Sequence, residues 1–249
     1  MASSSPLSAT QIEHFKMHGY LVIKNLFDAS DLNIWREQIW RELDSSIATP
    51  ETWPRDRSGL DGYAYDPPES TFGLHPKLMA IADQFGGGDF MLGDGIPIIR
   101  WPEPCNPWEM PKSGHIDAYG GRWLPFMFGA TMYLYDVEPG GGSLIYWPDS
   151  HYAAHRYFLE HPSRVDGSFL QQDGFNWNVF CDNPATGGEE FVAKAGDVVL
   201  WHAYLTHSNS ENINESPRIA LFTRYEHQRK HETEFRYEIP EDLWKNWAI

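Results

Sequence analysis

The first fifty residues combine helical and extended spacing of apolar side chains. Residues 8–11, Ser-Ala-Thr-Gln, match a capping box, which predicts a helix that runs to about His18 and ends at Gly19. The apolar run at residues 20–24 is typical of a strand. Asp28 then predicts the start of a second helix, because the apolar side chains after it recur every three or four residues, at Leu32, Trp35, Ile39 and Leu43.

Short apolar runs bounded by turn residues dominate the chain from about residue 96 onward. They lie at residues 96–101, 128–137, 143–147, 190–193, 198–201 and 218–225, and the turn signals between them lie at 138–142, 194–197 and 212–217. The pattern predicts a mainly β protein, a sandwich or barrel, without long helices between its strands. The two N-terminal helices are expected to pack on its outside. No linker or low-complexity segment divides residues 1–249, so we expect one domain.

Composition narrows the choice of partners. The formal net charge of −16, from 19 Lys and Arg against 35 Asp and Glu, disfavours nucleic acid, which needs a clustered basic surface. No apolar stretch approaches the length that spans a bilayer, and the N-terminus has no secretory signal, so we expect no membrane association. The two cysteines, Cys105 and Cys181, are too few for a disulfide framework or a zinc site. These features favour a cytoplasmic location.

Two ligand-type side chains, His115 and Asp117, are separated by one residue. On an extended strand they point to the same face, so they can bind one metal ion together. His207 follows about ninety residues later, after the strand predicted at 198–201. Two histidines and one carboxylate form a facial triad, which leaves coordination positions open and is used by non-haem iron(II) oxygenases. The open positions are needed because a cosubstrate and O₂ must both bind.

An arginine, Arg218, lies eleven positions after His207 at the start of a predicted strand. Its guanidinium fork is suited to a carboxylate, which makes it a candidate for the far carboxylate of 2-oxoglutarate. Each of these residues alone has an ordinary explanation, such as a chance His-x-Asp or a surface salt bridge. The specific signal is the joint pattern, in this order and on predicted strands.

Other polar residues compete for these roles. His202 is a rival distal ligand, but its distance along the chain from Arg218 favours His207. His151 and His155 are expected to be hydrogen-bonded structural residues rather than ligands. Arg224 shares the face of Arg218 by strand parity, and we expect a surface role for it, with contact to a substrate as the alternative.

The chain resembles the phytanoyl-CoA dioxygenase family of iron(II)/2-oxoglutarate oxygenases nearly from end to end. The resemblance rests on the F-x-x-x-G-Y opening at residues 15–20, on Gly114-His-Ile-Asp117, and on the segments 141–151 and 196–207 followed by Pro217-Arg218. Asp149 stands where the family usually has Gly, and Ser143 where it usually has Cys. Neither position is a ligand.

This resemblance implies a double-stranded β-helix (jelly roll), with Fe(II), 2-oxoglutarate and O₂ as cofactor and cosubstrates. It also implies that 2-oxoglutarate is decarboxylated to succinate and CO₂. Asn209 stands where the family often has a Ser that touches 2-oxoglutarate, and Asn can also donate a hydrogen bond. Thr131 and Tyr133 alternate on a predicted strand, where one of them hydrogen-bonds 2-oxoglutarate or both are ordinary strand residues. Halogenating relatives lack the carboxylate that Asp117 supplies, so hydroxylation or another oxidation is expected.

Substrate choice is expected to reside in the loops 50–75, 102–114 and 165–188. Their aromatic side chains favour an apolar or aromatic small molecule over a CoA thioester, whose phosphates would find few Lys or Arg there; these aromatics are Trp53, Tyr63, Tyr65, Phe72, Trp108, Phe169, Phe175 and Trp177. Two alternatives remain open from the residues: a cupin-like metalloenzyme that does not use 2-oxoglutarate, and a non-catalytic binding protein on the same fold. The sequence does not indicate an oligomeric state.

Overall fold

The computed structural model describes residues 5–103, 107–119, 126–171, 174–181 and 187–249. Its helices are α1 (Ala9–His18), α2 (Ala29–Glu42), α3 (Pro76–Gly86), α4 (Ser150–Glu160) and α5 (Thr233–Tyr237). Its strands are β1 (Tyr20–Ile23), β2 (Phe90–Leu92), β3 (Pro97–Arg100), β4 (Phe126–Tyr133), β5 (Leu144–Tyr146), β6 (Glu189–Glu190), β7 (Val198–His202), β8 (His207–Asn209) and β9 (Arg218–His227). In the part of the chain described, every helix is too short or too polar to cross a bilayer.

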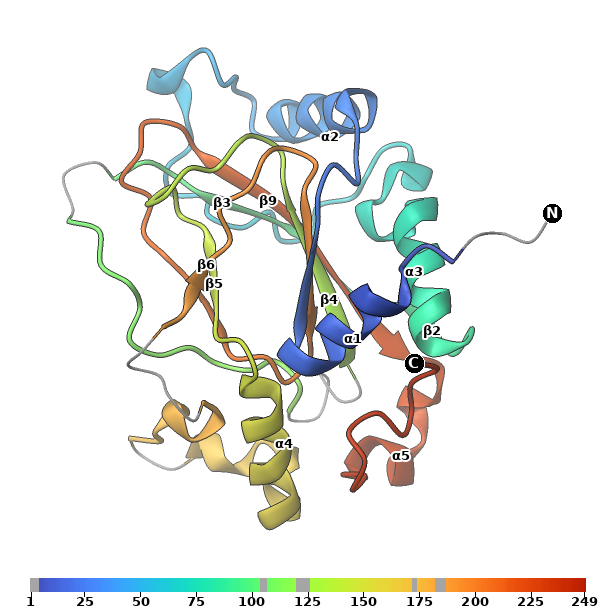
Figure 1. Ribbon diagram of the computed structural model, residues 1–249. Helices are drawn as coiled ribbons and strands as arrows, with labels where there is room; N and C mark the ends of the chain where they lie inside the picture. The colour runs from blue at the N-terminus through green and yellow to red at the C-terminus, as the bar shows by residue number, and fades with distance from the viewer. Residues whose placement is uncertain (1–4, 104–106, 120–125, 172–173, 182–186) are drawn as a thin grey trace.

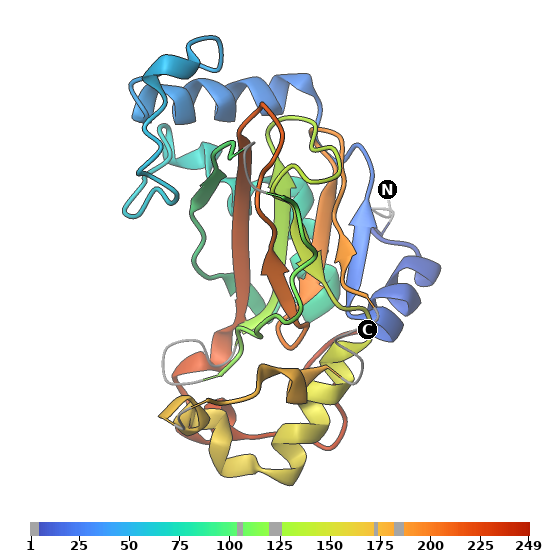
Figure 2. The same ribbon diagram turned by 90° about the vertical axis from the view of Figure 1, so that its left-hand side faces the viewer.

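The strands form two antiparallel sheets (Figures 1 and 2). The larger has the order β1-β7-β4-β9-β2, with β3 also paired to β9, and the smaller has the order β6-β5-β8. A cavity lies between them, because it is lined by side chains of β3, β4, β7 and β9 from the large sheet and of β5 and β8 from the small one. Most of the candidate site residues identified from the sequence line this cavity.

Three helices cover the other face of the large sheet, as Figure 1 shows for α1, α2 and α3. Phe15, Ile39 and Phe85, one from each helix, are fully buried in the same core cluster. The predicted capping box at Ser8 is present, and so is the helix start at Asp28. Gly19 ends α1 in the left-handed conformation (φ 75°) and donates its N–H to the carbonyl of Phe15, as the sequence predicts. The two predicted N-terminal helices are therefore confirmed on the outside of the sheet.

Successive side chains of the last strand, β9, point alternately into the core and into the cavity. Ile219 and Leu221 are buried in the helix-covered core, whereas Ala220 and Phe222 line the cavity. The same parity carries Arg218 and Arg224, at opposite ends of the lining row, into the cavity. One strand thus directs two guanidinium groups to the same side of the sheet.

The prediction of strands without intervening helices is wrong at α4, which directly follows β5. The side chains of His151, Ala154, His155 and Phe158 are buried there at helical spacing. Two of these four positions are histidines, so an apolar pattern does not reveal the helix. Helix α3, which begins at Pro76, was also not predicted.

The loop 50–75 does not contribute to the cavity, contrary to the expected role in specificity. It folds into short 3₁₀ turns, at Pro50–Thr52, Pro68–Ser70 and Phe72–Leu74. Trp53 and Phe72 are buried in the core with α2 and α3, and Tyr63 and Tyr65 pack against the same cluster. These aromatic side chains are hydrophobic core rather than pocket wall.

His151, in the first turn of α4, packs against α1 and is expected to make the stability of the fold depend on pH. Its Nε2 lies 3.0 Å from the carbonyl of Lys16, to which it donates, and its Nδ1 is buried without a hydrogen-bond partner among the described residues. Burial lowers the pKa of His151 to about 4, against the opposing effects of the Lys16 carbonyl and Asp149. Between pH 6.5 and 4 the unfolded chain therefore binds a proton that the folded chain does not. We expect the free energy of unfolding to fall by about 3 kcal/mol over this window from this group alone.

Urea unfolding of the wild type and of His151→Gln at pH 7, 5.5 and 4 measures this effect. The variant is expected to be less stable at pH 7 and to lose less stability on acidification. Burial also lowers the pKa of His202, so part of the wild-type slope remains in the variant. Equal pH slopes in the two proteins would contradict the assignment to His151.

Candidate metal and cosubstrate site

Three ligand-type side chains converge at one end of the cavity. His115 and His207 form an antiparallel bridge in which each backbone N–H donates to the other's carbonyl at 2.9 Å, so their imidazoles lie side by side. Oδ1 of Asp117 is 3.4 Å from Nε2 of His115 and 3.8 Å from Nε2 of His207. One ligand atom from each residue lies within 4.8 Å of the others, a cluster compact enough for one metal ion.

The protonation of these groups suits a cation. Nδ1 of His207 donates to the carbonyl of Leu205 at 3.0 Å, which leaves the lone pair of Nε2 directed at the cluster. Burial, helped by His115, lowers the pKa of His207 to about 4, so its imidazole is neutral at physiological pH. Burial alone would raise the pKa of Asp117. The neighbouring His207, the hydrogen bond from His115 and the charge of Arg224 hold that pKa well below its usual range, so the carboxylate stays ionised.

Arg218 lies further along the same cavity and is 2% exposed. Its Nε donates to the carbonyl of Gly142 at 2.7 Å, and its Nη2 donates to Oδ1 of Asn209 at 3.0 Å. Among the described residues no carboxylate pairs with it, and burial lowers its pKa to about 10, so it remains a cation at neutral pH. A buried cation without a counter-ion is unfavourable unless an anion completes the site.

The other predicted cosubstrate residues line the same space. The hydroxyl of Thr131 accepts from the indole N–H of Trp201 at 3.0 Å, and that of Tyr133 accepts from the backbone N–H of Leu144 at 2.7 Å. Each hydroxyl keeps its own hydrogen to donate into the cavity. Asn209 uses its amide oxygen on Arg218, so its NH₂ group is the part left to face a ligand.

Arg224 is not a surface residue, and the expectation of a surface role is wrong. Its side chain is 14% exposed, and its Nε and Nη2 donate to Oδ2 of Asp117 at 3.1 and 2.6 Å. Its Nη1 donates to Oδ1 of Asp94 at 3.1 Å. Strand parity with Arg218 was the available sequence signal, but the Asp117 and Asp94 partners come from distant segments that the sequence does not connect.

An aromatic cluster borders the outer side of the metal cluster. Trp177 meets the ring of His115 edge-on at 6.2 Å between centroids, and Tyr119 lies 5.8 Å from Trp177. Phe169 contacts both of these rings, and Phe175 contacts Trp177 and Phe169. The side chain of His115 is 45% exposed, compared with 8% for His207. Of the two histidines, His115, which lies beside the aromatic rings, is therefore the more accessible to solvent.

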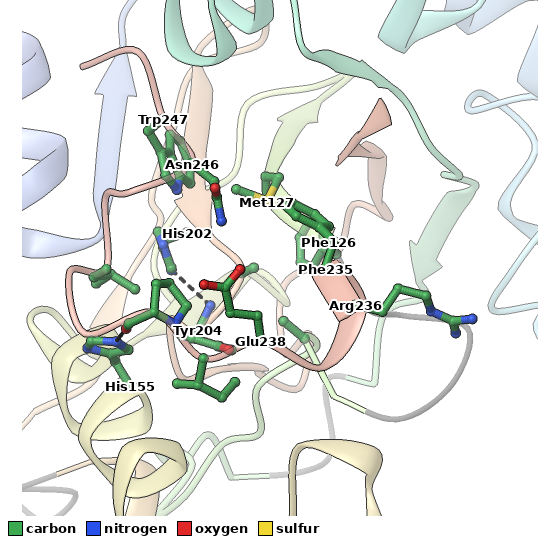
Figure 3. A pocket seen from close by; sticks show the side chains of 15 residues that line it. Phe126, Met127, His155, His202, Tyr204, Phe235, Arg236, Glu238, Asn246 and Trp247 are labelled. Atoms are coloured by element: carbon green, nitrogen blue, oxygen red, sulfur yellow. Dashed lines mark hydrogen bonds between the residues drawn. The ribbon is translucent and has the colours of Figure 1, made fainter. Parts of the chain in front are cut away.

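The rival histidines lie elsewhere, in a second cavity between β4, α4 and the C-terminal segment (Figure 3). Nδ1 of His202 accepts from the backbone N–H of Tyr204 at 3.0 Å, and the ring stacks on Trp247. Nε2 of His155 donates to the carbonyl of Pro240 at 2.7 Å. His202 faces away from His115 and Asp117, so among the described residues only His207 completes the cluster. Cys181 is buried, and Cys105 lies outside the described residues.

The phytanoyl-CoA dioxygenase (PhyH) family model matches residues 15–220. The chain belongs to this family. It is 26% identical over 252 residues to ectoine dioxygenase of Stutzerimonas stutzeri (strain A1501), covering 90% of this chain and 78% of that protein. HygX from Streptomyces hygroscopicus, solved with nickel and 2-oxoglutarate, has a TM-score of 0.60 at 20% identity, covering 88% of this chain and 87% of that one. SnoK, a carbocyclase from nogalamycin biosynthesis, has a TM-score of 0.64 at 19% identity, covering 91% and 88%.

As a member of the phytanoyl-CoA dioxygenase family, the chain is a 2-oxoglutarate-dependent non-haem iron dioxygenase that uses Fe(II), 2-oxoglutarate and O₂. Family membership therefore removes the two alternatives left open by the residues, the metalloenzyme without 2-oxoglutarate and the non-catalytic binding protein. The cluster of His115, Asp117 and His207 fits iron in its donor set, because it provides two imidazole nitrogens and one ionised carboxylate.

Proposed function

We propose that His115, Asp117 and His207 hold the iron(II), and that Arg218 binds the far carboxylate of 2-oxoglutarate. The observation that carries the proposal is the buried guanidinium of Arg218, which lacks a carboxylate partner in the described chain and faces the same cavity as the three ligands. We also infer that the two sheets form a double-stranded β-helix. The cavity between them, and the likeness in fold to HygX and SnoK, support this topology.

The polar residues of the cavity then have defined roles in binding the metal and 2-oxoglutarate. The bound iron, 2-oxoglutarate and O₂ supply the oxidising chemistry, in which 2-oxoglutarate becomes succinate and CO₂. Arg218 sets the depth at which 2-oxoglutarate enters, and Asn209 fixes the guanidinium through Nη2. The hydroxyls of Thr131 and Tyr133 donate to carboxylate oxygens of 2-oxoglutarate. Because Asp117 supplies a carboxylate ligand, the expected outcome is hydroxylation or a related oxidation of the substrate.

The substrate is proposed to be an apolar or aromatic small molecule that lies against Trp177 and Tyr119. These rings border the exposed edge of His115, where a substrate would approach the metal. Phe169 and Phe175, behind them, extend the apolar wall. A carbon held there is close to the metal while Arg218 occupies the opposite end of the cavity.

An anaerobic titration tests the cosubstrate assignment. Iron(II) is added to the protein, then 2-oxoglutarate, and the weak visible absorption band of the iron–2-oxoglutarate chelate is recorded. We expect the band to appear and to saturate as 2-oxoglutarate is added. A folded, iron-loaded protein that gives no band would refute it. Succinate release with a panel of aromatic, aliphatic and acyl-CoA compounds then tests the substrate class, and release driven by acyl-CoA compounds alone would refute the apolar or aromatic preference.

Substitution of Trp177 is expected to weaken binding of the substrate without changing binding of 2-oxoglutarate. Trp177→Ala removes the ring beside His115 and should raise the KM for the substrate about tenfold, because a buried aromatic contact contributes on the order of 1–2 kcal/mol. The concentration of 2-oxoglutarate that half-saturates the absorption band should change by less than twofold. Tyr237→Ala, which removes an exposed ring on α5, is the control. An unchanged substrate KM in Trp177→Ala would exclude this ring from the substrate site.

A further inference from the structure

The carboxylate of Asp117 is divided between two kinds of partner. Its Oδ2 accepts both hydrogen bonds from Arg224, through Nε and Nη2. Its Oδ1 is the oxygen near Nε2 of both histidines. One oxygen is therefore occupied by a guanidinium fork, and the other is directed at the metal cluster.

Arg224 is itself held in place from three directions. Its Nη1 donates to the side chain of Asp94, and its backbone N–H donates to the carbonyl of the same residue at 2.7 Å. The guanidinium lies over the ring of Phe222 at 4.9 Å and over that of Phe126 at 5.5 Å. These contacts leave little freedom for the fork to follow Asp117 if the carboxylate rotates.

We propose that Arg224 is a positioning residue that restricts Asp117 to a single coordinating oxygen and so keeps the third open position of the iron available. This inference rests on the metal ligands proposed above. An octahedral ion with three protein ligands, each giving one atom, has three open positions. 2-Oxoglutarate takes two of them, and O₂ needs the third. If Asp117 chelated through both oxygens, the position for O₂ would be lost.

Removal of Arg224 should have different effects if it restricts Asp117 to one coordinating oxygen than if it only supports the carboxylate. A guanidinium next to the site repels a dication, and its removal frees Oδ2 to bind the metal as well. Loss of Arg224 should therefore leave metal affinity unchanged or raise it, while turnover falls. A residue that only supported Asp117 would, when removed, weaken metal binding and turnover together.

Manganese(II) provides the decisive measurement, because the relaxation rate of water protons reports the number of exchangeable waters on the bound ion. Arg224→Met removes the fork but keeps an unbranched side chain against Phe222. We expect the relaxation enhancement per bound Mn(II) to fall by about one third, as waters fall from three to two. The Kd for Mn(II) should stay equal or tighten by up to about tenfold. Succinate formation in the iron-loaded variant should fall by at least tenfold.

Two further variants control the interpretation. Arg229→Met removes an exposed fork that also places Nε and Nη2 on one carboxylate oxygen, that of Glu232, and should change none of these quantities. Arg224→Lys keeps the charge without the fork, so we expect it to restore the wild-type Kd but not the full relaxation enhancement. An Arg224→Met protein with unchanged enhancement and a weakened Kd would overturn the proposal. If the ligand assignment itself were wrong, His207→Ala would retain Mn(II) binding, which distinguishes that failure from this one.

Discussion

Replacement of Arg218 by Met is expected to raise the 2-oxoglutarate concentration that half-saturates the chelate band by about 100-fold. The lost interaction is a charge-assisted pair in a buried site, for which about 3 kcal/mol is a reasonable magnitude, and each 1.4 kcal/mol is a factor of about ten in affinity. The methionine side chain keeps most of the volume, so the effect is not mainly a cavity. Iron binding should be retained, because the three ligands lie at the other end of the cavity.

The neighbouring Arg100 offers a matched control. It stands opposite Arg218 in the β3–β9 ladder, but its side chain is exposed. Arg100→Met should therefore change 2-oxoglutarate affinity by less than threefold. Arg218→Lys should fall between the wild type and the methionine variant, because a single ammonium cannot form the two parallel bonds of a guanidinium fork. Wild-type affinity in Arg218→Met would show that another residue binds the far carboxylate.

The elements predicted best are those in which one local signal suffices. The side chain of Ser8 accepts from one backbone N–H of the helix that follows it, and that of Asp28 accepts from two, so these residues specify the helix starts directly. The strand prediction at residues 198–201 succeeds for a similar reason, since β7 is a continuous buried apolar run. The pairing of the strands into two sheets depends on contacts between distant segments, which no local pattern contains.

The site residues also differ in whether a local sequence pattern is enough to predict their position. His115 and Asp117 face one side because alternation on an extended chain requires it. His207 joins them through a backbone bridge to His115, which the sequence only suggested through the order and spacing of the residues. The parity that places Arg218 in the cavity also places Arg224 there. Its pairing with Asp94 and Asp117 depends on how the chain brings segments more than a hundred residues apart together.

The composition of a loop does not show whether its aromatic side chains lie in the hydrophobic core or beside the site. Trp53 in the loop 50–75 and Trp177 in the loop 165–188 are both large aromatic residues in irregular segments. Trp53 is stacked on Trp101 in the helix-covered core, whereas Trp177 stands beside His115. The difference lies in which side of the large sheet each loop covers, and that is a property of the tertiary fold.

Loss of His207 is expected to abolish the metal site, the largest effect of any single substitution proposed. His207→Ala removes one of three ligands, and the two that remain, His115 and Asp117, come from a single segment of chain. We expect iron affinity to fall by at least 100-fold and the chelate band to disappear at any accessible 2-oxoglutarate concentration. Anaerobic equilibrium dialysis with iron(II), followed by absorption spectroscopy, measures both quantities.

His202 supplies the control because it is the histidine closest to His207 along the chain, on the preceding strand. His202→Asn leaves a side-chain oxygen to accept from the N–H of Tyr204, so the local turn is preserved. The variant should bind iron within threefold of the wild type, because the ring of His202 faces the second cavity and stacks on Trp247. Iron binding that survived in His207→Ala but failed in His202→Asn would reverse the assignment of the distal ligand. Loss in His207→Ala alone would leave β8, through the bridge between His207 and His115, as the element that assembles the metal site.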